Sequence, residues 1–583
     1  MQVTPSSDPL PEIKNQLIAV DYAVFLFYFI VVAAYGYWVY QKRKRQEAST
    51  TDFFLAEGSL TWWAIGASLI ASNISAEQFI AMSGSGFEVG IAIAAFEWIA
   101  ALSLILVGVF FMPIYLKNHI YTMPQFLERR YNETVALIMA VFWLFLYVFV
   151  NLTSILLLGA SAISVLVGTD AYHPVLIALS VFAIIITLGG MKVIGYTDVI
   201  QVVVLIVGGL ATSYIALTMV SDHFGLGDNN PIAGFKAILD QAPDHFHMML
   251  WRPGPDSSPE YVSKYLAVPA AMYFAGQWIA NLNYWGCNQY ITQRALGAKL
   301  ETARKGLLFA GFLKLLMPVI VVLPGIAAYV LHQNGKLQSE MALDGKFAFD
   351  NAYSAILGFL PDGLRGLSVA ALTAAIVASL AGKANSIATI FTLDIYKKYI
   401  DRGATERRQV WIGRITIVLS ILVAIACSWQ DAFDIKRGGF TFIQKYTGYV
   451  SPGIFAVFML GMFWKRTTGA AAIAGVLLGF VLSIFFNDVA PYLGYSETPF
   501  YTVYDTGAVN AVGERIMGIP YMICMGWAFA GTVLAMVIIS LAGPKVNPKA
   551  FEIDRSMFKV SPSTTVLIVA TLMILGALYA KFW

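Results

Sequence analysis

Ionisable side chains lie in the middle of stretches of the sequence that are otherwise apolar. Glu97 stands in AAFEWIA, Lys314 in GFLKLLMP and Lys383 in AAIVASLAGKANS. A charge in hydrocarbon is costly unless it is paired or faces water or a ligand, so such residues mark candidate functional positions. We predict that Lys314 pairs with Glu97. The alternative for Glu97 is a purely structural ion pair, and one residue can serve both purposes.

Amide and hydroxyl side chains gather in two further apolar segments. ALIASNISAEQF contains Asn73 and Gln78, and GQWIANLNYWGCNQY contains Asn281 and Tyr284. Asn and Ser compete for backbone hydrogen bonds, so we predict that both segments are interrupted helices. The alternative is that these side chains only hold neighbouring helices together. A fifth polar candidate, Gln444, lies near the outer end of a later apolar segment.

Tyr147 and Asn151 in YVFVNLTS are four residues apart and therefore share one helical face. Two roles remain open for this pair, helix–helix contact and the lining of a cavity.

The composition places these residues in a membrane protein. The 583 residues are 58% hydrophobic and 13% charged, whereas a soluble protein has about a quarter charged residues. Apolar runs long enough to cross a bilayer recur along the chain, which predicts an all-α polytopic protein with fourteen transmembrane helices. The predicted spans are 17–40, 60–84, 88–115, 134–167, 173–190, 195–220, 265–291, 304–332, 366–396, 410–430, 440–464, 467–487, 514–542 and 562–583.

The same composition and motifs exclude several classes of function. The net charge of +3 is too small to suggest nucleic acid as a partner. The three cysteines have neither a zinc spacing nor that of a disulfide framework. No P-loop, metal-ligating histidine pair or Ser–His arrangement is present, so we do not expect an enzyme.

Lysine and arginine orient the spans. Alternate loops contain QKRKRQ, LERRY, QRALGAKLETARK, YKKYIDRGATERR, WKRT and GPKVNPKAFEIDR, and the opposite loops are poorer in basic residues. The basic loops are therefore expected in the cytoplasm, with both termini external. The polar N-terminus and the long first apolar run argue against a cleavable signal peptide.

The two interrupted helices open blocks of five spans with opposite topology. Paired broken helices in inverted repeats are typical of secondary transporters with a binding site at the midplane, because the breaks free backbone groups for ligands. A channel would instead favour a repeated filter sequence, which is absent. The expected divisions are an N-terminal part (1–59), repeat 1 (60–220), an external loop (221–264), repeat 2 (265–464) and three peripheral helices (465–583).

Four segments carry a family resemblance: WWAIGASLIASNISAEQFIAMSGSGF, LGGMKVIGYTDVIQ, ANLNYWGCNQYITQRAL and MLGMFWKRTTGAAAI. They resemble the sodium/solute symporter family, above all its bacterial sodium/galactose and sodium/glucose-type branch. The resemblance implies a leucine-transporter-type core of two inverted five-helix repeats. It also implies import of a galactose- or glucose-like hexose, driven by Na⁺ through alternating access, across a bacterial inner (cell) membrane.

The resemblance also assigns residues. It implies a sugar site at Gln78, Glu97, Asn281, Lys314 and Gln444, and gates at Asn73, Tyr284, Met82, Phe96 and Phe440. Amides, a carboxylate and an ammonium suit sugar hydroxyls, which both donate and accept. Two positions depart from the branch, since Phe96 replaces a tyrosine and Ala100 replaces a serine that contacts the sugar.

The implied sodium site is incomplete. It uses the backbone carbonyls of Ala71, Ile74 and Ala375 together with a pair of hydroxyl residues, which here is Ala378–Ser379. Asp198 matches a position on the sodium route. The alternative for Asp198 is an ordinary helix cap.

Lys383 is outside the family pattern and lies one turn beyond Ser379. Three roles remain open: a surrogate for the cation, a substrate contact, or neither. As a surrogate it implies a proton-coupled or cation-independent sugar carrier, since a buried lysine that titrates can exchange H⁺. A symporter for another polar solute is a further alternative. A sugar sensor without flux is disfavoured because no soluble signalling domain is present.

Overall fold

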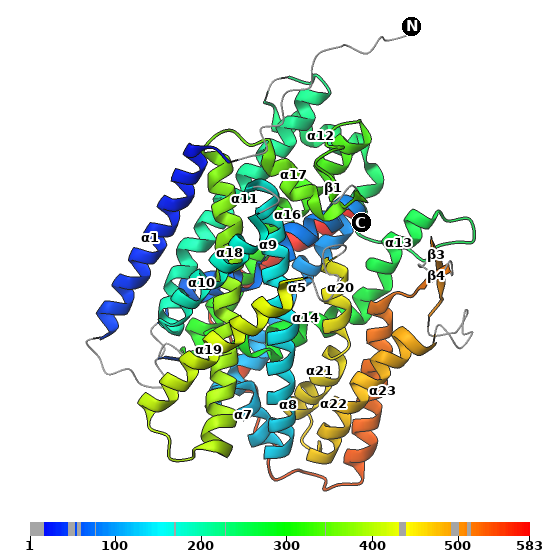
Figure 1. The fold of residues 1–583 in the computed structure, drawn as a ribbon. Helices are drawn as coiled ribbons and strands as arrows, with labels where there is room; N and C mark the ends of the chain where they lie inside the picture. The colour runs from blue at the N-terminus through cyan, green and yellow to red at the C-terminus, as the bar shows by residue number, and fades with distance from the viewer. Residues whose placement is uncertain are drawn as a thin grey trace.

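Long apolar helices make up almost all of the chain that the structure describes (Figure 1). The computed structural model describes residues 17–44, 53–54, 60–75, 77–167, 171–227, 229–343, 346–430, 439–490, 501–509 and 515–583. The helices of the N-terminal half are α1 (Ala19–Lys44), α3 (Trp62–Asn73), η2 (Glu77–Met82), α4 (Ser83–Glu88), η3 (Ile91–Ala94), α5 (Ala95–Leu106), η4 (Val107–Phe111), α6 (Met112–Lys117), α7 (Met123–Arg130), α8 (Glu133–Phe145), η5 (Leu146–Leu152), α9 (Thr153–Val167), α10 (Tyr172–Thr187), α11 (Met191–His223), α12 (Pro231–Gln241), η7 (Pro243–Phe246), α13 (Pro259–Ala267) and η8 (Ala270–Phe274).

The C-terminal half continues in the same way, with short π-helical turns inside several long helices. Its helices are α14 (Gly276–Cys287), α15 (Gln289–Leu296), α16 (Leu300–Gln333), η9 (Phe349–Asn351), α17 (Ala352–Gly358), α18 (Leu364–Thr389), η10 (Ile390–Ile400), α19 (Glu406–Ser428), α20 (Gly439–Gly448), α21 (Ser451–Phe463), α22 (Gly469–Ile484), η11 (Phe485–Val489), α23 (Tyr521–Leu541), η13 (Arg555–Phe558) and α24 (Pro562–Phe582).

Eleven helical stretches of the described chain are long and apolar enough to cross a bilayer. They correspond to eleven of the fourteen predicted spans. The predicted span 173–190 contains the shorter apolar helix α10, and the predicted spans 60–84 and 265–291 contain interrupted helices. The structure therefore describes a polytopic helical protein in which the two exceptional long segments are the ones with the polar motifs.

The break in the first polar segment follows Asn73. Helix α3 ends there, Ile74 has an extended backbone (φ −78°, ψ 115°), and the chain resumes as the π-helix η2 at Glu77. The side-chain oxygen of Gln78 accepts from the backbone N–H of Ser75 at 3.0 Å, which satisfies one of the donors freed by the break. The prediction of an interrupted helix is confirmed here.

The second polar segment is also interrupted. Helix α14 ends at Cys287, Asn288 is extended (φ −99°, ψ 125°), and α15 begins at Gln289. The phenol oxygen of Tyr147 accepts from the freed N–H of Gln289 at 3.2 Å. This prediction is confirmed, with the break at the C-terminal end of the polar patch.

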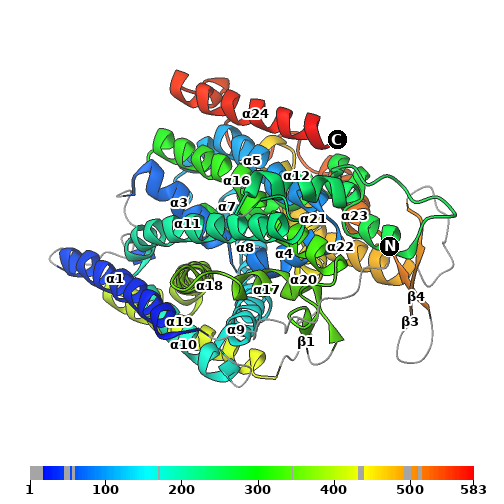
Figure 2. The same ribbon diagram turned by 90° about the horizontal axis from the view of Figure 1, so that it is seen from above.

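The interrupted helices lie at the centre of the bundle. Helix α16 packs against α3, α4 and α5, and α11 packs against α18, α16 and α3. Helix α14 packs against α5 and α21. Figure 2 shows α24 along the upper edge of the molecule and α1 at its left edge. The helices with the most polar residues are thus shielded from lipid by apolar ones.

Two antiparallel hairpins interrupt the helical pattern. The first lies between the predicted spans 304–332 and 366–396. The second ends inside the predicted span 514–542, in which Arg515–Gly518 form a strand and the helix begins only at Tyr521. The hairpins pair β1 (Ala342–Leu343) with β2 (Lys346–Phe347), and β3 (Tyr504–Val509) with β4 (Arg515–Gly518). The end of the chain contacts the stretch 221–264, since the N–H of Met248 donates to the carbonyl of Phe582 at 2.7 Å.

Three of the arginines that were counted as cytoplasmic loop residues are buried and structural. Arg130 donates to the carbonyls of Gly461 (2.6 Å), Trp464 (3.0 Å) and Thr467 (3.0 Å), around the end of α21. These carbonyls lie at the end of α21 and in the turn that follows it, and a guanidinium can donate to several at once. Arg294 and Arg304 are likewise buried. Sequence counting of basic residues cannot separate such arginines from those that face the solvent.

Gly90 provides a test of the packing between α4 and the segment 221–264. Its backbone has φ +90°, and a Cβ atom there would lie 2.4 Å from the carbonyl oxygen of His245. We expect Gly90→Ala to cost about 1–3 kcal/mol of stability through strain and this collision. A lowered melting temperature in detergent tests it, with Gly254→Ala as the control because nothing lies within 4 Å of that position. Equal melting temperatures for the two variants would contradict the described contact.

His245 provides a pH-dependent test of the same contact, because it lies in η7, outside the spans. The ring donates to the carbonyl of Phe87 at 3.0 Å and stacks on Tyr329 at 3.9 Å. Burial, and to a smaller extent nearby Lys264, lower the pKa of His245 from 6.5 to about 4, although the hydrogen bond to Phe87 acts in the opposite direction. Glu260 and Asp244 oppose these effects weakly.

Between pH 4 and 6.5 the unfolded chain binds more protons at His245 than the folded chain, so stability rises with pH in this window. Acidification from pH 6.5 to 4 should therefore remove up to about 3 kcal/mol through this residue. Melting temperatures across this range should fall more steeply for the parent protein than for His245→Asn. His247→Asn, at an exposed position, is the control and should follow the parent protein. Parallel curves for the parent protein and His245→Asn would contradict the assignment.

Candidate functional site

A polar cavity lies between the two interrupted helices and the helices that pack on them. Its walls come from α3, η2, α5, η5, α14, α15, α16, α18, α20, α21 and α23. Side chains lining it include Asn73, Glu77, Gln78, Met82, Phe96, Glu97, Ala100, Asn151, Asn281, Tyr284, Trp285, Asn288, Tyr290, Lys314, Lys383 and Gln444. All five residues of the predicted sugar site therefore line one cavity, although they come from five separate helices.

An ion pair forms one wall of the cavity. The Lys314 ammonium lies 2.5 Å from a carboxylate oxygen of Glu97, and both side chains are at most 4% exposed. Lys314 also donates to the side-chain oxygen of Asn73. The predicted partnership of Glu97 and Lys314 is confirmed. Because Glu97 and Lys314 also line the cavity, the structural and functional interpretations of the pair are compatible.

The amide of Asn73 connects this ion pair to Tyr284. Its nitrogen donates to the Tyr284 hydroxyl at 2.8 Å, while its oxygen accepts from Lys314. This hydrogen bond joins the end of α3 to the middle of α14, so the two interrupted helices are linked directly beside the cavity. The pairing of Asn73 with Tyr284 that the resemblance implies is present in the structure.

The three remaining amides keep hydrogen-bonding capacity for a ligand. The side-chain oxygen of Gln78 accepts from the N–H and the hydroxyl of Ser75. The side-chain nitrogen of Asn281 donates to the carbonyl of Gln277 at 3.0 Å. Within the described residues, the Gln78 nitrogen, the Asn281 oxygen and the Gln444 amide have no hydrogen-bond partner. Together with Glu97 and Lys314, these groups present donors and acceptors to one space.

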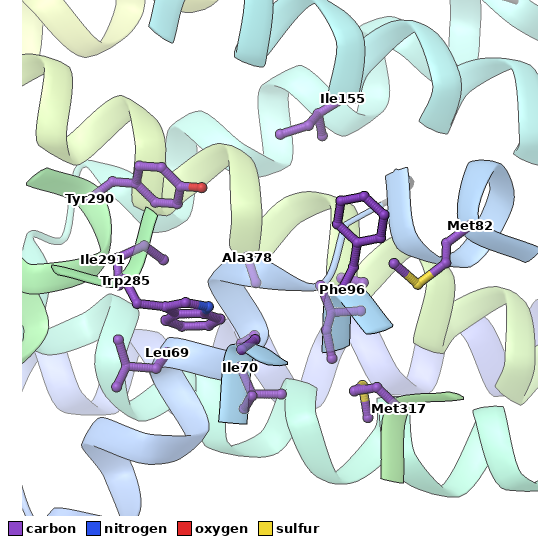
Figure 3. Close-up of a cluster of buried hydrophobic side chains, with 14 of the residues drawn as sticks. Leu69, Ile70, Met82, Phe96, Ile155, Trp285, Tyr290, Ile291, Met317 and Ala378 are labelled. Atoms are coloured by element: carbon purple, nitrogen blue, oxygen red, sulfur yellow. The ribbon is translucent and has the colours of Figure 1, made fainter. Parts of the chain in front are cut away.

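Apolar side chains form part of the cavity lining. In the view of Figure 3, Met82 and Phe96 lie on one side of Ala378, and Tyr290 and Trp285 lie on the other. Met82 and Phe96 are buried and line the cavity, and their gate role stays a prediction. The backbone of Phe440 begins α20, but its side chain lies outside the described residues, so its predicted gate role stays a prediction.

The residues of the implied sodium site meet where α18 crosses the break after α3. Ser379 donates from its hydroxyl to the carbonyl of Ser72 at 2.8 Å. Ala71, Ile74, Ala375 and Ala378 are buried around this contact. The Ser379 oxygen still has lone pairs for a cation, whereas Ala378 offers none. Among the described residues, no group of three or more acidic, His or Cys residues could hold a metal ion.

Asp198 lies in a buried polar cluster, and the alternative that it caps a helix is wrong because α11 begins seven residues earlier, at Met191. It accepts from the hydroxyl of Ser68 and lies 3.9 Å from the guanidinium of Arg294. Arg294 in turn donates to the hydroxyls of Ser68 and Ser72. The cluster reaches Ser72, whose carbonyl accepts from Ser379, so it adjoins the implied sodium site.

Sequence reasoning missed four residues of this region. Arg294 was counted as a loop residue, and Glu77, Asn288 and Tyr290 received no role. The side-chain oxygen of Asn288 accepts from the hydroxyl of Tyr147. Asn151, which shares a helical face with Tyr147, lines the cavity. Tyr147 therefore holds helices together while Asn151 faces the cavity. The available signal was the density of polar residues in NQYITQR, directly after the second broken helix.

The chain is similar to known proteins along most of its length. The model of the sodium:solute symporter family matches residues 53–479. The chain is 40% identical to a sodium/glucose cotransporter of Vibrio parahaemolyticus, over 98% of this chain and 100% of that protein. It is 33% identical to a sodium/myo-inositol cotransporter 2 of Oryctolagus cuniculus, over 82% of this chain and 71% of that protein.

A solved structure shares the fold. A Na⁺-coupled sialic acid symporter in a substrate-bound, outward-open state superposes with a TM-score of 0.73 at 20% identity, covering 91% of this chain and 99% of that one. A bundle of membrane-spanning helices with two interrupted helices around a polar cavity defines a secondary transporter. The extent of the family match makes the assignment specific: this chain belongs to the sodium:solute symporter family. It is thus a sodium-coupled solute symporter and not an enzyme.

Proposed function

We propose that the protein imports a galactose- or glucose-like sugar together with Na⁺ by alternating access. The observation that carries the proposal is the cavity in which Glu97, Lys314, Gln78, Asn281 and Gln444 converge. A sugar presents several hydroxyls, each donor and acceptor, and this set supplies acceptors and donors without an excess of either. The 40% identical sodium/glucose cotransporter supports the same substrate class.

The finer architecture belongs to the same proposal. The fourteen predicted spans comprise a core of two inverted five-helix repeats, entered at α3 and at α14, and peripheral helices at both ends. The protein lies in the cell membrane with both termini external, and the loop 221–264 faces the sugar supply. Supporting this, the helices in the predicted spans 60–84 and 265–291 are both interrupted, at Ile74 and at Asn288.

Alternating access follows from the contacts around the cavity. Na⁺ on the carbonyls of Ala71, Ile74 and Ala375 and on the Ser379 hydroxyl stabilises the crossing of α18 with the break after α3. Sugar binding then closes Met82 and Phe96 over the outer side. Breaking the Asn73–Tyr284 hydrogen bond releases the sugar inward, and the Asp198 cluster marks the route of the ion. Family membership favours sodium over protons as the coupling ion.

A competition screen in proteoliposomes tests the substrate. Uptake of a labelled hexose under an inward sodium gradient is measured against a panel of unlabelled hexoses and polyols. Gln78→Ala should reduce uptake of the preferred sugar by roughly 10-fold or more, because it removes a buried hydrogen-bonding group. Exposed Lys236→Met is the matched control. If Gln78→Ala transports like the control, the assigned sugar site is wrong.

A further inference from the structure

Lys383 places a positive charge in the cavity that the sugar site does not use. The side chain is 3% exposed, and its nitrogen lies 5.1 Å from the centre of the Tyr290 ring. Among the described residues it makes no hydrogen bond and no ion pair within 4 Å. An ammonium has three donors, and the aromatic ring covers only one side of it. The remaining donors point to the cavity that Lys383 lines.

The other charges of the cavity are already engaged. Lys314 and Glu97 form an ion pair at 2.5 Å. Glu77 accepts from the hydroxyl of Ser154 at 2.9 Å and attracts Lys383 only from a longer range. Neither Glu97 nor Glu77 therefore accepts a hydrogen bond from Lys383.

The charge balance of the cavity restricts what it can bind. Its lining has two carboxylates, Glu77 and Glu97, and two ammonium groups, Lys314 and Lys383, which sum to zero. A bound Na⁺ raises the sum to +1 in a region of low dielectric, where unbalanced charge is costly. Neutrality returns if Lys383 replaces Na⁺ or if the cargo brings one negative charge.

The position of Lys383 favours a cargo with one negative charge over replacement of Na⁺ by Lys383. Ser379 and Lys383 are four residues apart on α18, so Lys383 lies about 6 Å farther along the helix than the implied sodium site. No hydrogen bond joins its nitrogen to the described carbonyls of Ala71, Ile74 or Ala375. The ammonium faces Tyr290 and the cavity instead of the ion site.

We propose that the cargo is a sugar with a single carboxylate, such as a hexuronate, and that Lys383 binds this carboxylate. This inference rests on the proposed sugar-transport function and narrows its substrate class. The sugar hydroxyls contact Gln78, Glu97, Asn281, Lys314 and Gln444. The side-chain nitrogen of Asn288, which lines the same cavity and has no partner among the described residues, donates to the second carboxylate oxygen.

The test compares galacturonate and glucuronate with galactose and glucose as competitors in purified protein reconstituted into liposomes with a sodium gradient. For the parent protein, a hexuronate should compete at a concentration roughly 10-fold or more below that of the hexose, because a charge-assisted contact is worth that factor. Lys383→Met, which keeps the length of the side chain without its charge, should remove this preference and retain uptake of the neutral hexose. Lys383→Arg should keep the preference, and exposed Lys236→Met should change nothing.

The outcomes separate this inference from the proposed function. If hexoses compete and hexuronates do not, in the parent protein and in Lys383→Met alike, the acidic cargo is refuted and sugar transport stands. If neither class competes, sugar transport itself is refuted, and the inference with it. If Lys383→Met fails to insert or melts early, loss of the hexuronate preference in Lys383→Gln and its retention in Lys383→Arg decide the same question.

Discussion

Replacing Glu97 by Gln should abolish sugar accumulation and lower the melting temperature. The Glu97 carboxylate lies 2.5 Å from the Lys314 ammonium inside the bundle. Removing one charge of a buried pair leaves the other uncompensated, which costs about 3–5 kcal/mol. Lys314 also holds Asn73, so the Asn73–Tyr284 contact between the interrupted helices should loosen as well.

A double variant separates the effect of Glu97 on stability from its effect on sugar uptake. In Glu97→Gln with Lys314→Met neither position of this pair keeps a charge, so the melting temperature should recover while uptake stays lost. Glu552→Gln, at an exposed position away from the cavity, is the control and should behave like the parent protein. Substantial uptake by Glu97→Gln or by the double variant would contradict a role for Glu97 in the sugar site.

Substitutions at the neighbouring residues Ala378 and Ser379 should change the half-saturating sodium concentration in opposite directions. Ser379→Ala removes the hydroxyl at the crossing of α18 with the break after α3, and should raise the half-saturating sodium concentration roughly 10-fold or more. Ala378→Ser should lower it several-fold by adding an oxygen to the proposed site. Sodium titrations of initial uptake rates measure both effects.

A buried serine away from the site controls for the loss of a hydroxyl in general. Ser180 donates to the carbonyl of Leu176 within its own helix, so Ser180→Ala should leave the sodium titration unchanged. If Ser379→Ala and Ser180→Ala give the same titration curve, the ion is not held at this crossing.

Much of the site could be predicted because membrane burial makes polar residues conspicuous. Glu97 and Lys314 each stand alone in an apolar helix, so each needs a partner, and the pairing follows. The two breaks, after Asn73 and at Asn288, follow from the density of Asn and Ser in their segments. The assignment of the five polar residues to one cavity came from the resemblance to a family, since residues on five helices are not linked by spacing.

The rest depended on contacts that sequence does not encode locally. Arg294 belongs to a basic segment like those that were expected in the cytoplasm, and only the packing of α15 against α3 brings it to Asp198 and Ser72. Lys383 was conspicuous, but its three alternative roles differ by which neighbour lies within a few ångströms. The Tyr290 ring and the cavity wall provide that information.

Sugar accumulation under a sodium gradient tests the central claim most directly. The purified protein in liposomes is given the preferred labelled sugar under an inward Na⁺ gradient, under equal Na⁺ on both sides, and under an inward H⁺ gradient without Na⁺. We predict accumulation above the external concentration only in the first condition. Accumulation that is independent of sodium, or driven equally by the H⁺ gradient, would contradict the account.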